Sequence, residues 1–250
     1  MQPKRLQWKV AGINHQGWLL EITDSGRDLY PAIKLAYERA KRKGTLKWDL
    51  VRLELMSRFG YYVTESSEHS AEYTPWFIKS RYPGLIAEFN IPLDEYPRRC
   101  IAQIADWKRM RQEFIANTAL QHSRSHEYAS YIMEAMETNV PYKLGGNVMN
   151  TGLITNLPAK ACVEVPCLAD RSGITPTFVG DLPEQCAALN RTNINPQILT
   201  VEAVLSGKKE FVYQAALMDP HTSAELSIDD TIRLCKDLFK AHGQMIPRLK

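Results

Sequence analysis

Apolar side chains recur every three to four residues in several segments of the chain, and polar residues fill the positions between them. This period matches one face of an α-helix, so each segment predicts a helix that turns its apolar face inward. The predicted helices span residues 27–43, 46–59, 93–118, 126–137, 183–207, 208–218 and 228–242. In segment 93–118 the inward face is expected to carry Ile101, Ile104, Ala105, Trp107 and Phe114. We expect helix 183–207 to be interrupted near Asn195-Pro196, because proline lacks the backbone donor that a helix interior needs.

Shorter apolar runs between turn residues predict strands. The chain opens on LQWKVAGINHQGWLLEI, which predicts two strands joined at a turn that contains Asn14 and His15. Further strands are predicted at 142–148, 152–156, 161–168 and 174–179. The sequence therefore predicts an α+β fold, dominated by helices, with a central sheet.

Residues 61–79, YYVTESSEHSAEYTPWFIK, follow neither period. A run rich in ionisable and hydroxyl side chains, without a repeat, is typical of a loop held on a scaffold. Glu68, His69, Glu72 and Tyr73 fall within six positions, so acid, base and hydrogen-bonding groups gather here. The alternative is a surface turn without a chemical role. Its aromatic anchors in the core would be Tyr61, Tyr62 and Trp76.

Composition excludes several classes of protein. The chain has 44% hydrophobic and 24% charged residues, as ordinary globular proteins do, and a net charge of +3 gives no argument for nucleic-acid binding. No apolar run approaches about 18 residues, and MQPKRLQWKV lacks the apolar core of a signal peptide, so neither a membrane span nor secretion is predicted. Five cysteines, an odd number, indicate reduced thiols and a cytoplasmic location. Cys162 and Cys167 are expected to be small core residues of a strand, and His122 and His126 to be surface residues.

Several separate runs follow the pattern of one enzyme family. They are AGINHQGWLLEI, FGYYVTESSEHSAEYTPWFIK, IPLDEYPRRC, GNVMNTGLITNLPAKACVEVPCLADRSGITPTFVGDLP, TNINPQILTVEAVL and AALMDPHTSAELSIDD. In this order, and over nearly the whole chain, they resemble the melibiase (α-galactosidase) branch of glycoside hydrolase family 4. The first of them resembles the GxNH segment of that family.

The resemblance implies a fold like that of lactate and malate dehydrogenases, and a redox-assisted reaction with NAD and a divalent metal, usually Mn²⁺. NAD would take a hydride from C3 of the sugar, and the resulting ketone would acidify the proton on C2. A base would remove that proton, and the group on C1 would leave by elimination. Addition of water and return of the hydride would complete hydrolysis, with the metal acting as a Lewis acid. The two-carboxylate scheme of most glycosidases does not apply to this family.

Site residues follow from the same resemblance. The histidine of the GxNH segment implies that His15 is a metal ligand, with Asn14 beside it contacting either the metal-bound sugar or the groups that surround the metal ligands. The tyrosine of AEYTPW implies that Tyr73 is the general base. Glu68 and His69 are expected to bind sugar hydroxyls or to orient the tyrosine.

Two departures from the family pattern shape the expectation for this chain. The sequence contains no GxGxxG fingerprint, so the usual pyrophosphate site of a Rossmann domain is missing. The family also carries a cysteine ligand upstream of the GxNH segment, and MQPKRLQWKVA has none. We therefore expect residues 1–250 to form the C-terminal substrate and metal domain, without its NAD-binding domain. Such a chain is expected to bind manganese weakly, through one histidine, and to be inactive alone.

Three alternatives stay open at this point. The substrate could be an α-galacturonide or α-glucuronide, whose carboxylate would need a cation such as Arg124 or Arg52. The chain could instead be a non-catalytic module for oligomerisation or interaction. A hydroxy-acid dehydrogenase domain would give no reason for the run TESSEHSAEY. The expected partners are a small α-galactoside and further copies of the chain, without nucleic acid or membrane.

Overall fold

The computed structural model describes residues 5–117, 119, 123–125 and 127–250. The strands are β1 (Leu6–Ile13), β2 (Gln16–Asp24), β3 (Arg27–Asp28), β4 (Tyr62–Val63), β5 (Tyr142–Met149), β6 (Cys162–Asp170) and β7 (Gly173–Pro176). The first helices are α1 (Tyr30–Arg42), α2 (Leu50–Phe59), α3 (Ser67–Glu72), α4 (Gly84–Glu88) and α5 (Glu95–Ala116). They are followed by α6 (Ala129–Thr138), α7 (Glu184–Ser206), α8 (Lys209–Met218), α9 (Pro220–Glu225), α10 (Ile228–His242) and the short 3-10 helix η2 (Gly243–Met245).

One antiparallel sheet contains both the strands near the start of the chain, β1 to β4, and the strands from its middle, β5 to β7. Its order is β3-β2-β1-β6-β5, with β4 paired to β2 and β7 paired to β6. β1 and β2 pair from Leu6 opposite Asp24 to Ile13 opposite Gln16, so the turn between them consists of Asn14 and His15 alone. β1 meets β6 at Gly12 opposite Glu164, which brings the middle of the chain beside this turn. The expected helix-dominated α+β fold with a central sheet is confirmed.

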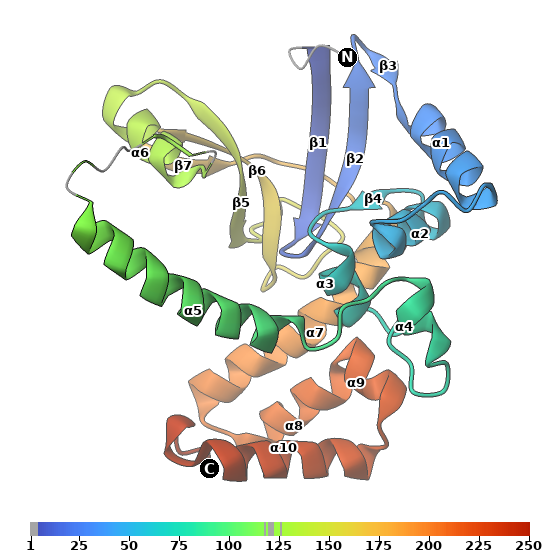
Figure 1. Cartoon of the computed structure of the whole chain (residues 1–250), viewed down its shortest axis with the longest axis vertical. Coiled ribbons are helices and arrows are strands. Elements are labelled where there is room, and N and C mark those ends of the chain that lie inside the picture. Colours follow the sequence, from blue (N-terminus) through green and yellow to red (C-terminus); the bar gives the residue numbers. More distant parts are fainter. Residues whose placement is uncertain (1–4, 118, 120–122, 126) are drawn as a thin grey trace.

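Helices cover the end of the sheet that carries the β1–β2 turn. In Figure 1, α7 crosses below the sheet, and α8, α9 and α10 lie on the side of α7 that is turned away from the sheet. The two termini therefore fall at opposite ends of the molecule. The main core lies between sheet and helices and includes Trp18, Val163, Val165 and Ile194, all fully buried. Alternation along β6 places Val163, Val165 and Cys167 inward, as a strand with one covered face requires.

The described part of the chain corrects several predictions. The apolar side chains expected to face inward on α5 point to solvent: Ile101 is 70% exposed and Trp107 is 58% exposed, and no residue of α5 is buried. Their helical period is real, but α5 has no element of the described chain packed over that face. Cys162 is likewise exposed, whereas Cys167 is buried as expected.

Tertiary contacts also override local signals. α7 continues through Pro196 although proline costs roughly 3 kcal/mol inside a helix, because residues just before it are fixed in the core. Residues 152–156 form no strand, and Ile154 makes a single bridge to Gly180. Segment 61–79, expected to be a loop, contains β4 and the short helix α3. His122 and His126 lie outside the described residues, and no helix within them has a stretch long and apolar enough to span a membrane.

Candidate active site

The turn between β1 and β2 holds His15 in a backbone conformation that few side chains adopt. His15 has a φ of 65°, in the left-handed region, which histidine tolerates better than most residues. The turn closes tightly because Gly12 lies against it: a Cβ at Gly12 would be 2.3 Å from the carbonyl oxygen of Gln16. Glycine is required there, and the result is an imidazole presented at the edge of the sheet.

Segment 62–73 is docked over this turn by backbone pairing. β4 pairs with β2, and the Thr64 amide donates to the Gly17 carbonyl at 2.7 Å, while the Gly17 amide donates to Thr64 Oγ1 at 3.1 Å. Ser66 then caps α3, accepting from the His69 amide at 3.1 Å, and its hydroxyl lies 2.8 Å from His69 Nδ1. Because one turn of α3 separates His69 from Tyr73, both rings end on the side that faces the β1–β2 turn.

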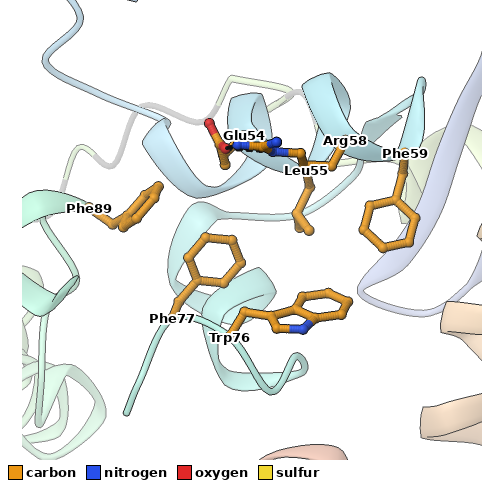
Figure 2. A pocket seen from close by; sticks show the side chains of 7 residues that line it. All are labelled: Glu54, Leu55, Arg58, Phe59, Trp76, Phe77 and Phe89. Atoms are coloured by element: carbon orange, nitrogen blue, oxygen red, sulfur yellow. Dashed lines mark hydrogen bonds and ion pairs between the residues drawn. The ribbon is translucent and has the colours of Figure 1, made fainter. Parts of the chain in front are cut away.

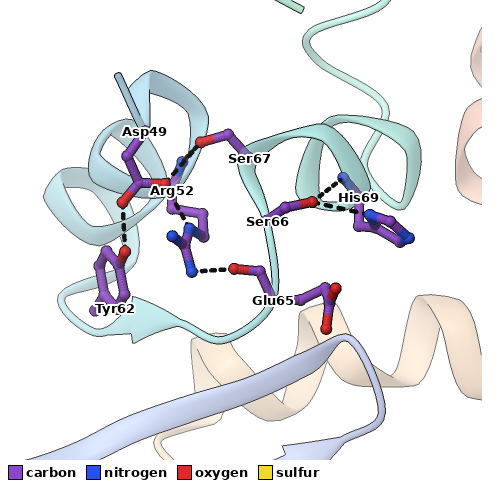
Figure 3. Close-up of polar contacts among 7 residues, drawn as sticks. All are labelled: Asp49, Arg52, Tyr62, Glu65, Ser66, Ser67 and His69. Atoms are coloured by element: carbon purple, nitrogen blue, oxygen red, sulfur yellow. Dashed lines mark hydrogen bonds and ion pairs between the residues drawn. The ribbon is translucent and has the colours of Figure 1, made fainter. Parts of the chain in front are cut away.

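A buried carboxylate fixes the bend before α3. Asp49, whose side chain is 3% exposed, accepts hydrogen bonds from Arg52, from Ser67 Oγ at 2.9 Å and from the Tyr62 hydroxyl. Arg52 also donates to the backbone carbonyl of Glu65, as Figure 3 shows. Glu65 has a φ of 70°, again in the left-handed region. The Asp49–Arg52 pair thus holds the strained residue whose side chain points toward the β1–β2 turn.

A second polar network, buried in the core, ties the turn to α7 and to the end of α3. Asn193 Nδ2 donates at 3.1 Å to Gln16 Oε1 and at 3.1 Å to the Tyr73 carbonyl. Asn190 Nδ2 donates to the Gln16 carbonyl at 2.8 Å, and Asn190 Oδ1 accepts from Trp18 Nε1 at 3.1 Å. These buried groups satisfy one another, and each bond spans more than 100 residues of sequence. They set the distance between the turn and Tyr73.

The outcome is a compact cluster of two histidines, a tyrosine and a glutamate. The ring centroids of His15 and His69 are 4.7 Å apart, with 9° between the planes, and those of His15 and Tyr73 are 5.6 Å apart. Glu65 Oε2 lies 3.6 Å from His15 Nδ1, a buried nitrogen that has no hydrogen-bond partner among the residues the structure describes. Donor atoms of His15, Glu65 and His69 all fall within 4.8 Å of one another.

Negative charge surrounds this cluster. Burial raises the pKa of the Tyr73 phenol, and the charges of Glu72, Glu65 and Asp219 raise it further. Burial also raises the pKa of Glu164 on β6, with a contribution from Glu65. As the chain stands, the phenol is therefore a weaker acid than a free tyrosine.

The structure brings three of the predicted site residues together. His15, His69 and Tyr73 come together, although 58 positions separate the first from the last. Asn14 is exposed at the turn. Glu68 is half-buried on α3, and within the described residues no hydrogen bond or ion pair joins it to the cluster.

Sequence reasoning missed Glu65, although it lies in the run TESSEH, which stands out for its acid and base groups. It also missed Glu164, whose position in an apolar strand was the only available signal. Gln16 and Asn193 were missed as well, because only the fold brings them together.

An apolar cavity of about 400 Å³ lies apart from this cluster. Its lining, drawn in Figure 2, consists of Glu54, Leu55, Arg58, Phe59, Trp76, Phe77 and Phe89. The two charged residues of the lining pair with each other at 2.8 Å, so the cavity offers no unpaired group for catalysis. Phe59 contacts Trp76 at 5.6 Å between centroids, which anchors the end of segment 61–79 to α2. Segment 61–79 therefore contains both an aromatic anchor to the core, through Trp76, and the residues of the polar cluster.

Imidazole, carboxylate and phenol groups brought together in this way are the side chains that metal-assisted acid–base chemistry uses. A family model, family 4 glycosyl hydrolase C-terminal domain, matches residues 10–222. The chain belongs to glycosyl hydrolase family 4.

Individual relatives agree with this family. The chain is 61% identical, over 251 residues, to the α-galactosidase of Bacillus subtilis (strain 168), covering 100% of this chain and 57% of that protein. It is 32% identical to the α-galactosidase of Rhizobium meliloti (strain 1021), over 97% of this chain and 51% of that protein. The crystal structure of a 6-phospho-α-glucosidase from gut microorganisms, in complex with NAD and Mn²⁺, matches with a TM-score of 0.72 at 21% identity, over 99% of this chain and 57% of that one. The chain thus spans about half the length of the relatives it matches.

Proposed function

We propose that this chain is the substrate- and metal-binding part of an α-galactosidase that acts with NAD and a divalent metal. The observation that carries the proposal is the 5.6 Å stacking of His15 and Tyr73, the two residues that the family resemblance assigns to metal and base. The 61% identity to an α-galactosidase along the whole chain supports the sugar class. Residues 1–250 contain no GxGxxG loop of the kind that holds the phosphates of the nicotinamide cofactor.

The residues do fit a divalent cation. His15 Nδ1 is a buried nitrogen that accepts or donates no hydrogen bond within the described part of the chain, and the Glu65 carboxylate faces it. A cation held there would polarise hydroxyl oxygens of a bound sugar and would favour the ionised form of the neighbouring phenol.

Tyr73 would be the base that accepts the proton from C2 of a sugar whose C3 is already a ketone, so that the electrons of the broken C2–H bond pass into an enediolate. His69 Nδ1 lies against the Ser66 hydroxyl, which fixes the ring and leaves Nε2 free to meet the substrate or the cation.

The same geometry disfavours an acidic sugar as the substrate. Arg52, one of the two cations considered for a uronic acid, already bonds Asp49 and the Glu65 carbonyl. Arg124, the other, pairs with Glu134 and lies over the Tyr131 ring. Glu65, Glu72 and Asp219 contribute negative charge, which repels a substrate carboxylate.

A fusion protein tests the proposal. The segment of the Bacillus subtilis relative that precedes its match to this chain is joined to residues 1–250, and hydrolysis of p-nitrophenyl α-galactoside is measured with NAD and Mn²⁺. We expect turnover that falls by roughly 10²- to 10⁴-fold in Tyr73→Phe, because the phenyl ring cannot accept a proton. Faster cleavage of the α-galacturonide than of the α-galactoside would overturn the assignment of substrate.

Self-association remains a separate proposal for this chain. The exposed apolar face of α5 is the feature that favours a partner surface. Size-exclusion chromatography with light scattering measures it, and a monomer at all concentrations would argue against both a homo-oligomer and a non-catalytic oligomerisation module.

A further inference from the structure

Glu164 is a carboxyl side chain on β6 that has no role in the site as described so far. Along β6 the side chains of Val163 and Val165 enter the core and are fully buried, so Glu164, between them, points to the other face of the sheet. It is half-buried there, and no hydrogen bond or ion pair from the described residues reaches its carboxyl. Partial burial of an unpaired carboxyl costs free energy, so a ligand explains its presence better than folding does.

The positions around Glu164 carry little side-chain bulk. Its direct neighbours across the sheet are Gly12 on β1 and Asn147 on β5. Glu164 Oε1 lies 3.4 Å from the point that a Cβ of Gly17 would occupy, and 3.7 Å from the corresponding point at Gly145. Three of these four neighbours are glycines, so the carboxyl lies over backbone and stays accessible to a small ligand.

The carboxyl also lies beside the cluster at the β1–β2 turn. Thr64 Oγ1 is 2.9 Å from the same Cβ position of Gly17, and it accepts a hydrogen bond from the Gly17 amide at 3.1 Å. Thr64 is followed by Glu65, whose carboxylate approaches His15. Burial, and then the charge of Glu65, raise the pKa of Glu164, as expected for two carboxyls that face one space.

We propose that Glu164 binds a hydroxyl group of the sugar, on the side of the ring away from the reacting carbons. This inference rests on the proposed function and adds a residue to its substrate site. The reaction takes place at C1, C2 and C3, so the hydroxyls left for recognition are those on C4 and C6. A carboxyl suits either of them, because its oxygens accept a hydrogen bond and its protonated form also donates one.

Asn147 extends the same recognition surface. It is exposed and stands directly opposite Glu164, so its amide lies on the same face of the sheet as the carboxyl. An amide and a carboxyl side by side offer donors and acceptors to one sugar edge. The hydroxyl on C4 is the group that distinguishes a galactoside from a glucoside, so a contact to it would select the sugar.

Unfolding of the isolated chain separates sugar binding from a structural role. Glu164→Met keeps the length of the side chain and removes its hydrogen-bonding oxygens. We expect its midpoint in urea, followed by circular dichroism, to equal or exceed that of the unaltered chain, because no protein contact of the carboxyl is lost. A lower midpoint would show that the carboxyl supports the fold, and it would overturn the proposal.

Hydrolysis by the fusion enzyme identifies the hydroxyl. kcat/KM is measured with NAD and Mn²⁺ for p-nitrophenyl α-galactoside and for its 4-deoxy and 6-deoxy analogues. The matched control is Asp170→Asn, which neutralises a carboxylate on the same face of β6 that accepts a hydrogen bond from the Ser172 amide. We expect Glu164→Met to lower kcat/KM for the full sugar by roughly 10- to 100-fold, and the control to change it less than about threefold.

The loss in Glu164→Met should shrink to less than about threefold for the one analogue that lacks the bound hydroxyl, and persist for the other. An equal loss with all three substrates, or no loss beyond that of Asp170→Asn, would overturn the contact. An inactive unaltered fusion would instead refute the proposed function, while the unfolding test of Glu164 on the isolated chain would still hold. The two proposals therefore fail in different ways.

Discussion

Replacing Asn193 with alanine tests the idea that a buried polar network sets the distance between the β1–β2 turn and Tyr73. The Asn193 side chain is 3% exposed and its amide donates to Gln16 Oε1 and to the Tyr73 carbonyl, each at 3.1 Å. Asn193→Ala removes both donors at once and leaves two acceptors in the core. The exchange adds no volume, so the effect is not confused with overpacking.

The magnitude follows from these two acceptors. A buried acceptor that loses its donor costs about 1–3 kcal/mol. Gln16 Oε1 keeps a longer contact, at 3.5 Å, with Asn190, which lowers its share of the loss. We therefore expect Asn193→Ala to lower the free energy of unfolding by about 2–4 kcal/mol, which is a large part of the stability of an average domain. Tyr73 is also released from α7, so its position relative to His15 becomes less defined.

Urea unfolding, followed by circular dichroism, measures this loss. Asn195→Ala is the matched control, because Asn195 lies on the same helix two residues further on and is exposed. We expect the control to stay within about 0.5 kcal/mol of the unaltered chain. A double-mutant cycle with Gln16→Ala should give a coupling energy of about 0.5–3 kcal/mol. If Asn193→Ala and Asn195→Ala unfold at the same urea concentration, the network does not hold the site and the reasoning fails.

Three further predictions concern the scaffold. Gly12→Ala should destabilise the chain by about 1–3 kcal/mol in the same unfolding assay, because the new Cβ would lie 2.3 Å from a carbonyl oxygen; an unchanged midpoint would contradict the tight turn. Asp49→Ala should cost about 3–5 kcal/mol, since it leaves the Arg52 guanidinium without its buried partner, and a loss below 1 kcal/mol in thermal unfolding would refute this role. Burial opposes ionisation of Glu54, but hydrogen bonds from Lys41 and its neighbours lower the pKa to about 2, below the ordinary 4.5. Its contribution, about 1 kcal/mol after solvent screening, is present above pH 4.5 and is lost as the pH falls toward 2; Glu54→Gln should abolish that part of the acid dependence.

The longer helices and the two strands around the β1–β2 turn could be predicted from periodicity, because their packing faces are local properties of the sequence, whereas the short helices α3, α4 and α9 were not predicted. α10 begins where Ser227 caps it and ends at His242, as its pattern indicated. The pattern could not tell which apolar faces find a partner. α5 has the period of a buried helix, yet within the described residues its apolar face stays open. Periodicity predicts that a helix has an apolar face, but what packs against that face depends on the rest of the folded protein.

The kinds of side chain in the candidate site could largely be predicted from the sequence, but not which residues of each kind would come together. The run TESSEH indicated acid and base groups, and the structure brings Glu65 of this run beside His15, whereas the sugar-binding role expected of Glu68 stays a prediction. The position of Glu65 depends on backbone conformation, because it adopts a left-handed φ while Arg52 holds its carbonyl. A sequence pattern assigns side chains to faces on the assumption of regular geometry, so it fails where a residue is held out of the regular regions.

The supporting contacts explain why such strain can persist here. Left-handed conformations at His15 and Glu65 cost of order 1–3 kcal/mol each, and neither is compensated within its own segment. Asp49 and Arg52 offset the second, and the amides of Asn190 and Asn193 fix the residues that follow the first. Both sets leave His15 Nδ1 and the Glu65 carboxylate without a hydrogen bond from any described residue. A chain selected for stability alone would have satisfied His15 Nδ1 with a neighbouring donor or acceptor. The molecule instead uses two buried networks to keep that nitrogen and the Glu65 carboxylate 3.6 Å apart, which is the arrangement expected if a ligand supplies the missing contact.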